Sequence, residues 1–367
     1  MIFLLGAGFG NAPALAKDVW VAQVAPFGGA LAQAGRDFNL GITVALNEIN
    51  MTGGVNGNRL RLVSRDDGYR SKDTVSHARE ILQKYEPVAF LGMWGAENIS
   101  AVLQSKLLES KGVPVIGVTS GMAEFRITPA LFHIRAGYKD EVSRILDQMQ
   151  TMATTRIAVV YEDEAFGREA WDQAQKMLAA RQLKPATVVA LPSSNVDVAP
   201  AVTQIVAADP QAVLLVANTP VAGAVISGIR GKGLKSLVFA TSTVNAEQLV
   251  KQLGAAASGT AIAQGMPSPY RIKTPVAQDF RKQIVALGID LERMNFASLE
   301  GYVATRVLAE GLRRAGRDVD AKALAKTLES MRRYDLGGFW IDFSAANHEG
   351  SRYVDMSIVG DDGRIRQ

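Results

Sequence analysis

The sequence predicts an α/β protein with two lobes, each built on a doubly wound, mostly parallel sheet. Its 367 residues are more than one ordinary hydrophobic core accommodates, so two domains are expected. Short apolar, β-branched segments alternate with longer amphipathic segments, which is the pattern of strands followed by helices. This alternation runs through residues 18–135 and starts again at residue 139, and two consecutive series of this kind indicate two α/β domains.

The repeating unit is clearest in residues 88–121. Residues 88–91 form an apolar run too short for a helix, which Gly92 should end. Apolar residues fall on one face of a helix over 101–111, and 113–118 is a second apolar, β-branched strand, expected to be buried and parallel. Small molecules bind beyond the carboxyl ends of such strands, so we expect the ligand at the turns 92–98 and 119–123.

The other elements follow from the same periodicities and from turn residues between them. The glycines at 28, 29 and 35 indicate a loop before the first helix, and those at 53–57 a tight turn. In the first series we expect further strands at 19–25, 60–64 and 132–135, with helices after Gly35 and at 71–85. In the second series we expect helices at 139–152, 168–181, 199–208 and 221–231, and strands at 157–161, 187–190, 212–217 and 237–240.

The last hundred residues have a different order. Helices are predicted at 276–286, 298–315 and 320–330, and strands at 338–343 and 353–359, with a turn at 361–363. Because helices come first and strands last, the chain is expected to return and complete both domains, crossing between them more than once.

Composition excludes several classes of function. The formal charge is only +4, and Lys and Arg are scattered along the chain, so no nucleic-acid surface is expected. There is no cysteine, which rules out disulfides and thiolate metal sites. The three histidines lack metal-ligand spacing, and no hydrolase, metalloprotease or nucleotide-binding motif occurs, so we expect no enzyme, no catalytic residues, no metal and no cofactor.

The first residues resemble an export signal. Residues 2–9 are apolar, and Ala14-Leu15-Ala16 before Lys17 fits a signal-peptidase site. The run is too short to span a bilayer. We therefore expect residues 1–16 to be a signal peptide, shortened at its start because the usual basic region is missing, and the mature protein to be periplasmic.

Several longer stretches carry a family resemblance. They are VAPFGGALAQAGRDFNLGITVALNEIN at 24–50, GGVNGNRLRLVSRDDGY at 53–69, VAFLGMWG at 88–95, IAVVYEDEAFGREA at 157–170, SLEGYVATRVLAEGLRRAG at 298–316 and DLGGFWIDF at 335–343. In order and spacing the chain resembles the type I periplasmic binding proteins, the solute-binding subunits of ABC importers, in their branched-chain amino acid-binding group. The resemblance covers residues 17–367 and implies a monomer that delivers a small molecule to ABC permease subunits.

The resemblance also implies two lobes joined by three hinge crossings, with the ligand in the cleft between them. We expect the crossings near Gly137, Gln264 and Gly337. Lobe 1 would then comprise 17–137 and 265–337, and lobe 2 would comprise 138–264 and 338–367. Closure would occur by bending at the hinge.

The ligand contacts of the family map onto this sequence with several replacements. Hydroxyl residues that hold the substrate carboxylate correspond to Ala96 and Gly121, the latter with Thr119 and Ser120 beside it, and a tyrosine of the first turn corresponds to Ala34. In the second lobe an aromatic position corresponds to Phe166, a tyrosine to Asn218, and the glutamate that pairs with the substrate ammonium to Thr243. Most polar side-chain contacts of the family are therefore absent, which puts the identity of the ligand in question more than its class.

The residues at the turns still offer ligand chemistry. Backbone N–H groups of Gly95 and Ala96, and of Ser120 and Gly121, are suited to a carboxylate at the start of a helix. Trp94 and Phe166 offer apolar surfaces from opposite lobes. A ligand ammonium requires acceptors, and the candidate acids are Glu97, Glu124, Asp163 and Glu164, for each of which a solvated cap or surface role is the favoured interpretation. Arg135 is open to two interpretations, as a carboxylate partner or as part of an ion pair near the hinge.

The expected function is thus capture of a small amphipathic carboxylate, with an aliphatic branched-chain amino acid as the first choice. An aromatic or other carboxylate without an ammonium is the alternative, because Thr243 replaces the acid. A ligand sensor of the same fold is the other alternative, since ligand binding would look the same in both.

Overall fold

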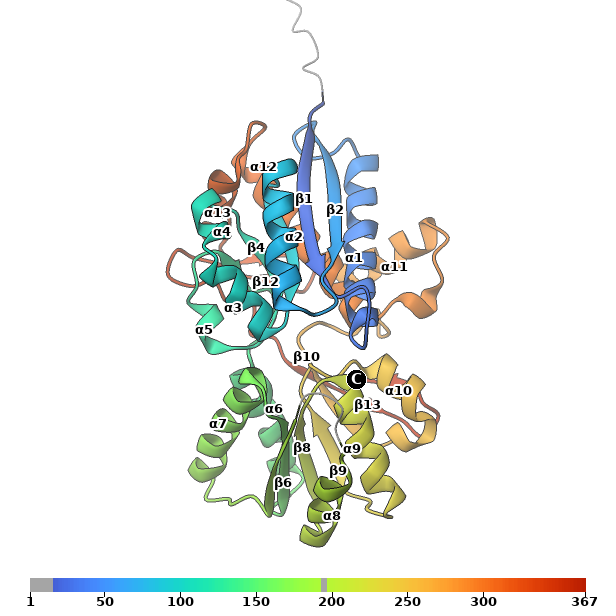
Figure 1. The fold of residues 1–367 in the computed structure, drawn as a ribbon. Helices are drawn as coiled ribbons and strands as arrows, with labels where there is room; N and C mark the ends of the chain where they lie inside the picture. Colours follow the sequence, from blue (N-terminus) through green and yellow to red (C-terminus); the bar gives the residue numbers. More distant parts are fainter. Residues whose placement is uncertain (1–15, 193–196) are drawn as a thin grey trace, which may run out of the picture.

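The computed structural model describes residues 16–192 and 197–367, which form two α/β lobes, one above the other in Figure 1. The strands of the first sheet are β1 (Asp18–Ala25), β2 (Arg59–Asp66), β3 (Ala89–Trp94), β4 (Val115–Thr119) and β5 (Leu131–Phe132). Their order is β2-β1-β3-β4-β5, and every neighbouring pair is parallel. The predicted fold class is confirmed.

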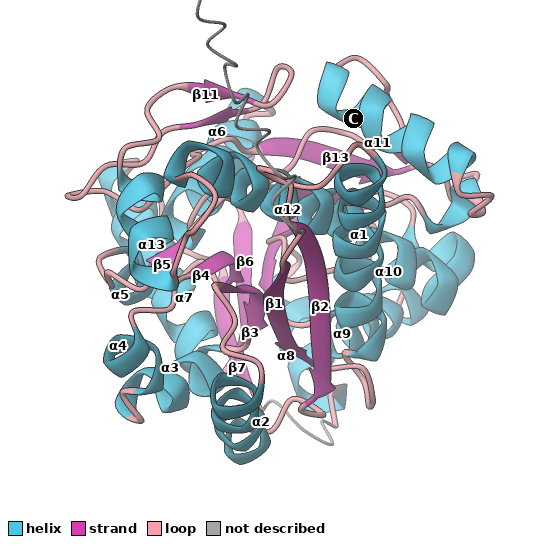
Figure 2. Cartoon of the chain, turned by 90° about the horizontal axis from the view of Figure 1, so that it is seen from above, coloured by secondary structure: helices cyan, strands magenta, loops and turns pink. Residues whose placement is uncertain are grey.

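Helices cover both faces of the first sheet. They are α1 (Ala32–Met51), α2 (Ser71–Lys84), α3 (Ala96–Gln104), α4 (Leu107–Lys111), α5 (Ala123–Arg126), α11 (Pro275–Ala286), α12 (Phe296–Ala315) and α13 (Ala321–Glu329). Seen from above, α1 and α12 lie on one side of the sheet and α2 and α3 on the other (Figure 2). Neighbouring strand residues point to opposite faces, so Leu91 packs with α1 and α12 whereas Phe90 packs with α2 and α3.

The second sheet has the order β14-β13-β10-β9-β8-β6-β7. Its strands are β6 (Ile157–Glu162), β7 (Thr187–Leu191), β8 (Ala212–Val216), β9 (Leu237–Ala240), β10 (Thr260–Gln264), β13 (Asp355–Val359) and β14 (Ile365–Arg366). The first five of these pair in parallel, and β13 and β14 are antiparallel additions at one edge. The accompanying helices are α6 (Tyr138–Thr151), α7 (Ala165–Ala180), α8 (Ala199–Ala208), α9 (Thr219–Gly231) and α10 (Ala246–Leu253).

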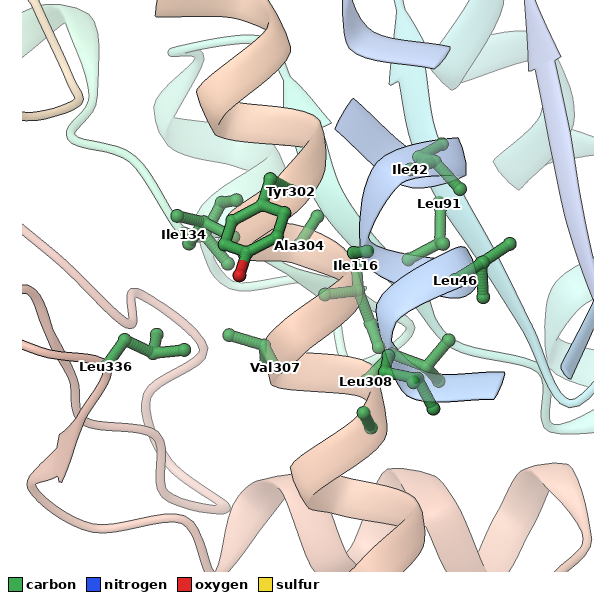
Figure 3. Packing of buried hydrophobic residues seen from close by; sticks show 14 of the residues in the cluster. Ile42, Leu46, Leu91, Ile116, Ile134, Tyr302, Ala304, Val307, Leu308 and Leu336 are labelled. Atoms are coloured by element: carbon green, nitrogen blue, oxygen red, sulfur yellow. The ribbon is translucent and has the colours of Figure 1, made fainter. Parts of the chain in front are cut away.

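The core of the first lobe forms where α1 and α12 meet the sheet. Figure 3 shows Ile42 and Leu46 of α1 beside Leu91, Ile116 and residues of α12. Two glycines allow the helices to come this close. A Cβ on Gly41 would lie 1.9 Å from the carbonyl oxygen of Ser298, and a Cβ on Gly301 would lie 2.0 Å from that of Phe38. The two helix backbones are therefore in direct contact, which fixes the position of α12 relative to the sheet.

The C-terminal segment first completes the first lobe. The short hairpin of β11 (Tyr334–Asp335) and β12 (Trp340–Ile341) leads into Phe343, whose ring packs edge-on against Phe132 at 5.2 Å between centroids. The N–H of Gly350 then donates to the carbonyl oxygen of His133 at 2.7 Å. Only at β13 does the chain join the second sheet. We therefore propose that the third crossing lies between 350 and 355 rather than at Gly337, with 338–350 belonging to lobe 1.

Several predicted elements differ in their ends. Gly92 does not end the third strand, since β3 continues to Trp94. Within the strand Gly92 adopts φ +68°, a conformation that favours glycine. The helix expected at 101–111 is two helices, divided where Lys106 adopts a left-handed conformation (φ +56°). Gly35 is not a loop residue but lies in α1, where a Cβ would be 2.0 Å from the carbonyl oxygen of Pro26.

Other elements were shorter than expected or were missed. The strand at 132–135 is reduced to β5, and that at 338–343 to β12. The elements α5, α10, β10, β11 and β14 were not predicted. The predicted signal peptide falls almost entirely on residues 1–15, which lie outside the described part of the chain. Across 16–192 and 197–367, no helix combines the length and apolar character that a membrane crossing needs.

Candidate ligand-binding cleft

A cavity of about 120 Å³ lies between the two lobes, at the carboxyl ends of both parallel sheets. In each sheet the strand order reverses at this edge, between β1 and β3 in the first and between β6 and β8 in the second. The crevice at such a reversal is where open α/β sheets bind ligands. The cleft is therefore formed by two of these crevices facing one another.

The structure brings all nine predicted site residues to this one cavity. From the first lobe these are Trp94, Gly95, Ala96, Thr119, Ser120 and Gly121, and from the second they are Phe166, Asn218 and Thr243. Ala34 and Arg135 line it as well. The four acids considered for a ligand ammonium, Glu97, Glu124, Asp163 and Glu164, are not among the lining residues, whereas Glu247 and Glu300 are.

Aromatic rings form one wall in the first lobe. The indole of Trp94 packs edge-on against Phe38, with ring centroids 4.9 Å apart. Gly95, at φ +83°, leaves room for the ring of Tyr69, which would lie 2.8 Å from a Cβ there. Burial, followed by the nearby charge of Glu164, raises the pKa of the Tyr69 phenol, so it stays protonated. The phenol is thus a neutral hydroxyl at the cavity.

The two predicted threonines already use their hydroxyl protons within the protein. Thr119 Oγ1 donates to the carbonyl oxygen of Met93 at 2.7 Å, and Thr243 Oγ1 donates to that of Ala217 at 2.8 Å. Thr243 also lies 2.8 Å from the hydroxyl of Thr241. Each threonine can therefore offer a ligand an oxygen lone pair, but not a proton, without giving up a contact.

A buried acid supports the second-lobe turn that carries Asn218. Glu162, at the end of β6, accepts the Asn218 backbone N–H at 2.7 Å and its side-chain amide at 3.4 Å. Burial raises the pKa of Glu162 to about 7, although the hydrogen bonds from Asn218 oppose this effect. On the same side of the cleft, Phe166 at the start of α7 packs near Tyr138, with ring centroids 6.2 Å apart.

The side of the cavity next to the first crossing carries an ionic network that joins the lobes. Arg135 contacts Glu300 of α12 at 3.4 Å and Glu141 of α6 at 3.5 Å, and it also donates to the hydroxyl of Ser242. Burial by itself lowers the pKa of Arg135, but the charges of Glu300 and Glu141 outweigh it and raise that pKa. Burial raises the pKa of Glu300, and Arg135 opposes this only in part.

Two further contacts hold the lobes together. Glu169 of α7 accepts the N–H of Ala123, across the cleft, at 2.8 Å. The hydroxyl of Tyr270 donates to Glu247 of α10, whose pKa is raised by burial. Within the described part of the chain, no group of three or more His, Cys, Asp or Glu residues is placed to hold a metal ion.

The cavity lies between the carboxyl ends of the two sheets, and contacts between the lobes bridge it. This arrangement is that of a two-lobed ligand-binding protein. The chain belongs to the periplasmic binding protein family, whose pattern matches residues 18–364. The family consists of substrate-binding proteins rather than enzymes.

Similar proteins are found in sequence and in structure. The chain is 23% identical over 364 residues to Leu/Ile/Val-binding protein homolog 3 of Brucella melitensis, covering 98% of this chain and 96% of that protein. A substrate-binding periplasmic protein from Ralstonia solanacearum superposes with a TM-score of 0.89 at 32% identity, over 95% of this chain and 99% of that protein. A branched-chain amino acid transporter substrate-binding protein from Streptococcus pneumoniae, in complex with isoleucine, has a TM-score of 0.85 at 16% identity. The superposition covers 96% of this chain and 98% of that protein.

Tyr69 and Glu300 were not singled out as site residues from the sequence. Tyr69 is the last residue of a stretch that carries the family resemblance. Its position in the turn after β2 could have predicted that it lies at the ligand site. Glu300 lies between Leu299 and Tyr302, which are both fully buried. A carboxylate on the buried face of an amphipathic helix requires a partner, and this pattern was the signal for Glu300.

Proposed function

We propose that this protein is the periplasmic solute-binding subunit of an ABC importer. It captures a small amphipathic carboxylate in the interlobe cleft and delivers it to the permease, and an aliphatic branched-chain amino acid is the first choice of ligand. The observation that carries this proposal is the position of the cavity, which collects the nine expected contact residues from two lobes. Relatives named for leucine, isoleucine and valine binding support the choice of ligand.

The chemistry of the cleft matches the two ends of such a molecule. The amides of the first turn of α3, beginning with Ala96, have no acceptor within their own helix and are suited to a carboxylate. Trp94 and Phe166 supply apolar surface for a side chain. The hydroxyls of Thr119 and Thr243 serve as acceptors, because their protons are already bonded to the protein.

Export, the lobe boundaries and the hinge belong to the same proposal. Residues 1–16 act as the signal peptide, and the mature chain works as a monomer. The crossings at Gly137 and Gln264, together with the one we place between 350 and 355, act as the hinge. Closure then brings α7 and the start of α5 into contact, as in the Glu169–Ala123 hydrogen bond.

A thermal-shift screen of the mature protein tests the proposal. The panel contains aliphatic and aromatic amino acids, their deaminated counterparts and small amides. A ligand that binds only the folded state raises the melting temperature by mass action. We expect leucine, isoleucine or valine to raise the melting temperature. If none of the carboxylates in the panel raises it, the proposal is contradicted.

A carboxylate without an ammonium is the second candidate ligand. It is favoured by one observation, which is that Thr243 occupies the position of the expected acid and its hydroxyl is already bonded. A shift with aromatic acids alone would support this candidate. A sensor of the same fold would bind the ligand equally well, and a pull-down of permease subunits by the liganded protein distinguishes transport from sensing.

A further inference from the structure

Near the first crossing, one guanidinium at the cleft is shared between two carboxylates. Arg135 is the guanidinium at this place, and it faces two carboxylates, those of Glu141 and Glu300. The neighbouring Arg126 donates to the backbone carbonyl of Arg135 at 2.7 Å and faces Glu349 at 3.9 Å. Arg126 also lies close enough to oppose the raised pKa of Glu300, but less than Arg135 does. The one guanidinium that contacts both carboxylates is therefore shared between them beside the cavity.

The two carboxylates are satisfied to very different degrees. Glu141 Oε2 accepts the N–H of Ser242 at 2.9 Å, and Oε1 accepts the Ser242 hydroxyl in addition to its contact with Arg135. Within the described residues, the carboxylate of Glu300 has one hydrogen bond, a long one of 3.4 Å from Arg135 to Oε2. Its Oε1 is buried and has no hydrogen-bond partner in the described part of the chain. Glu300 is thus the less satisfied of the two carboxylates.

An oxygen in this state is costly for the fold unless a ligand uses it. Glu300 is only 7% exposed, and a buried acceptor without a partner loses its hydration without compensation. Buried polar groups without partners are rare, and a functional role is one accepted reason for them. Glu300 also lines the cavity, as do Phe296 and Ala297 one turn earlier on α12.

The other acid at the cavity does not share this property. Glu247 accepts a hydrogen bond from the hydroxyl of Tyr270. Thr243, at the position expected to hold an acid, is engaged with Ala217 and Thr241. Among the cavity-lining carboxylates that the structure describes, Glu300 is the one with a buried oxygen that has no hydrogen-bond partner.

We propose that Glu300 is the acceptor for a positively charged amino group of the ligand, so that the cleft selects amino acids over carboxylates without an amine. This inference rests on the proposed function, because it names the ligand class of the same cleft. The ammonium lies at α12 and the carboxylate lies at the first turn of α3. The acidic partner of the ammonium thus comes from the lobe opposite to Thr243. An ammonium beside Glu300 stabilises its ionised form and gives its unpaired oxygen a partner.

The test compares matched pairs of ligands by calorimetric titration of the mature protein. Each pair is an amino acid and its deaminated acid, namely leucine with 4-methylpentanoate, valine with 3-methylbutanoate and phenylalanine with 3-phenylpropanoate. The wild-type protein is expected to bind the amino acid of at least one pair roughly tenfold or more tightly than its partner, since a buried charged hydrogen bond is worth that much. Equal or tighter binding of the deaminated acids would overturn the inference and leave the carboxylate-binding function standing. Absence of binding by all six would contradict the function itself, and the inference with it.

Glu300→Gln provides the residue-specific test. This substitution keeps the shape and removes the charge, so amino acid affinity should fall roughly tenfold to a hundredfold while affinity for the deaminated acid stays equal or rises. Glu109→Gln is the matched control, because Glu109 is an exposed acid on α4 that does not line the cavity, and it should change neither affinity. Unchanged amino acid affinity in folded Glu300→Gln would overturn the assignment. Should that variant fail to fold, the ligand-pair comparison on the wild-type protein still decides the matter.

Discussion

The backbone N–H of Ala123 donates a 2.8 Å hydrogen bond to the Glu169 carboxylate, and this bond joins the two lobes across the mouth of the cleft. Ala123 follows the last turn residues of the first sheet that line the cavity, and Glu169 lies one turn after Phe166 on α7. The bond can form only when the lobes approach, so it should stabilise the closed arrangement. A hydrogen bond to a charged acceptor contributes about 1.5–3 kcal/mol, less where solvent reaches it, as at this half-buried carboxylate.

Glu169→Ala should therefore shift the protein toward an open arrangement and weaken ligand binding. We expect a loss of affinity of roughly threefold to tenfold. Small-angle X-ray scattering should show a larger radius of gyration without ligand. Gln175→Ala, six residues further on the same helix and exposed, is the control and should leave both quantities unchanged. Identical scattering and affinity for Glu169→Ala and wild type would mean that this bond plays no part in closure.

Contact between the backbones of α1 and α12 predicts that alanine is not tolerated at Gly41 or Gly301. A Cβ at either position would meet a carbonyl oxygen at 1.9 Å or 2.0 Å, which no side-chain movement relieves. Gly41→Ala and Gly301→Ala should each lower the free energy of unfolding by about 3 kcal/mol or more, measured by urea denaturation. Gly231→Ala is the control, because nothing lies within 4 Å of its added Cβ, and it should be neutral or stabilising. Near-wild-type stability of either core variant would contradict the close helix contact.

Phe166 should contribute apolar contact to the bound ligand. Phe166→Ala is expected to weaken binding by about 1–3 kcal/mol, because the buried ring surface is lost. Calorimetry with the tightest carboxylate of the screen measures this change. Trp171→Ala alters a ring on the same helix that stacks on Tyr161 and does not line the cavity, so it should affect stability but not affinity. Wild-type affinity in Phe166→Ala would remove Phe166 from the site.

Stability should depend on pH through Glu162. Burial raises the pKa of this acid to about 7, above its ordinary value of 4.5, so the folded state binds a proton more tightly than the unfolded state. Between these two values the unfolded state holds fewer protons, and the free energy of unfolding therefore falls as the pH rises. The contribution is fully present below about pH 4.5 and is lost above about pH 7, with a total of roughly 3 kcal/mol.

Glu162→Gln isolates this contribution from those of the other buried acids. Urea denaturation at pH 5 and at pH 8 should show a smaller loss of stability in the variant than in the wild-type protein. The glutamine retains an oxygen for the Asn218 N–H, so the turn that lines the cleft is preserved. Equal losses in both proteins would show that Glu162 does not titrate with a raised pKa in the fold.

Much of the architecture was predictable because the periodicities are strong. Nearly every strand and helix before residue 240 was expected, since buried parallel strands are continuous apolar runs such as β8, which is fully buried. The departures arise where tertiary contacts override local signals. Gly35 resembled a loop residue but serves a close approach to Pro26, and Gly92 resembled a strand end but continues β3. In the segment 246–264 both α10 and β10 were missed, although α10 is amphipathic and begins at a cap that Asn245 provides to the N–H of Gln248.

The cleft was predictable in position but not in its charges. The rule that ligands bind beyond the carboxyl ends of parallel strands led directly to Trp94, Ser120 and their neighbours. It did not lead to Glu300, because this residue lies on a helix almost two hundred positions away and approaches the cavity only through the packing of α12 on α1. Ion pairs such as Arg135 with Glu141 and Glu300 likewise depend on how the two lobes come together.

The most direct measurement is a crystal structure of the mature protein grown with the best carboxylate from the thermal-shift screen. The account predicts the ligand between the lobes, with its carboxylate within hydrogen-bond distance of the first-turn amides of α3 and its apolar part between Trp94 and Phe166. An amino group, if the ligand has one, should face Glu300. A ligand bound outside the cleft, or one in the cleft that makes no contact with these groups, would contradict the account.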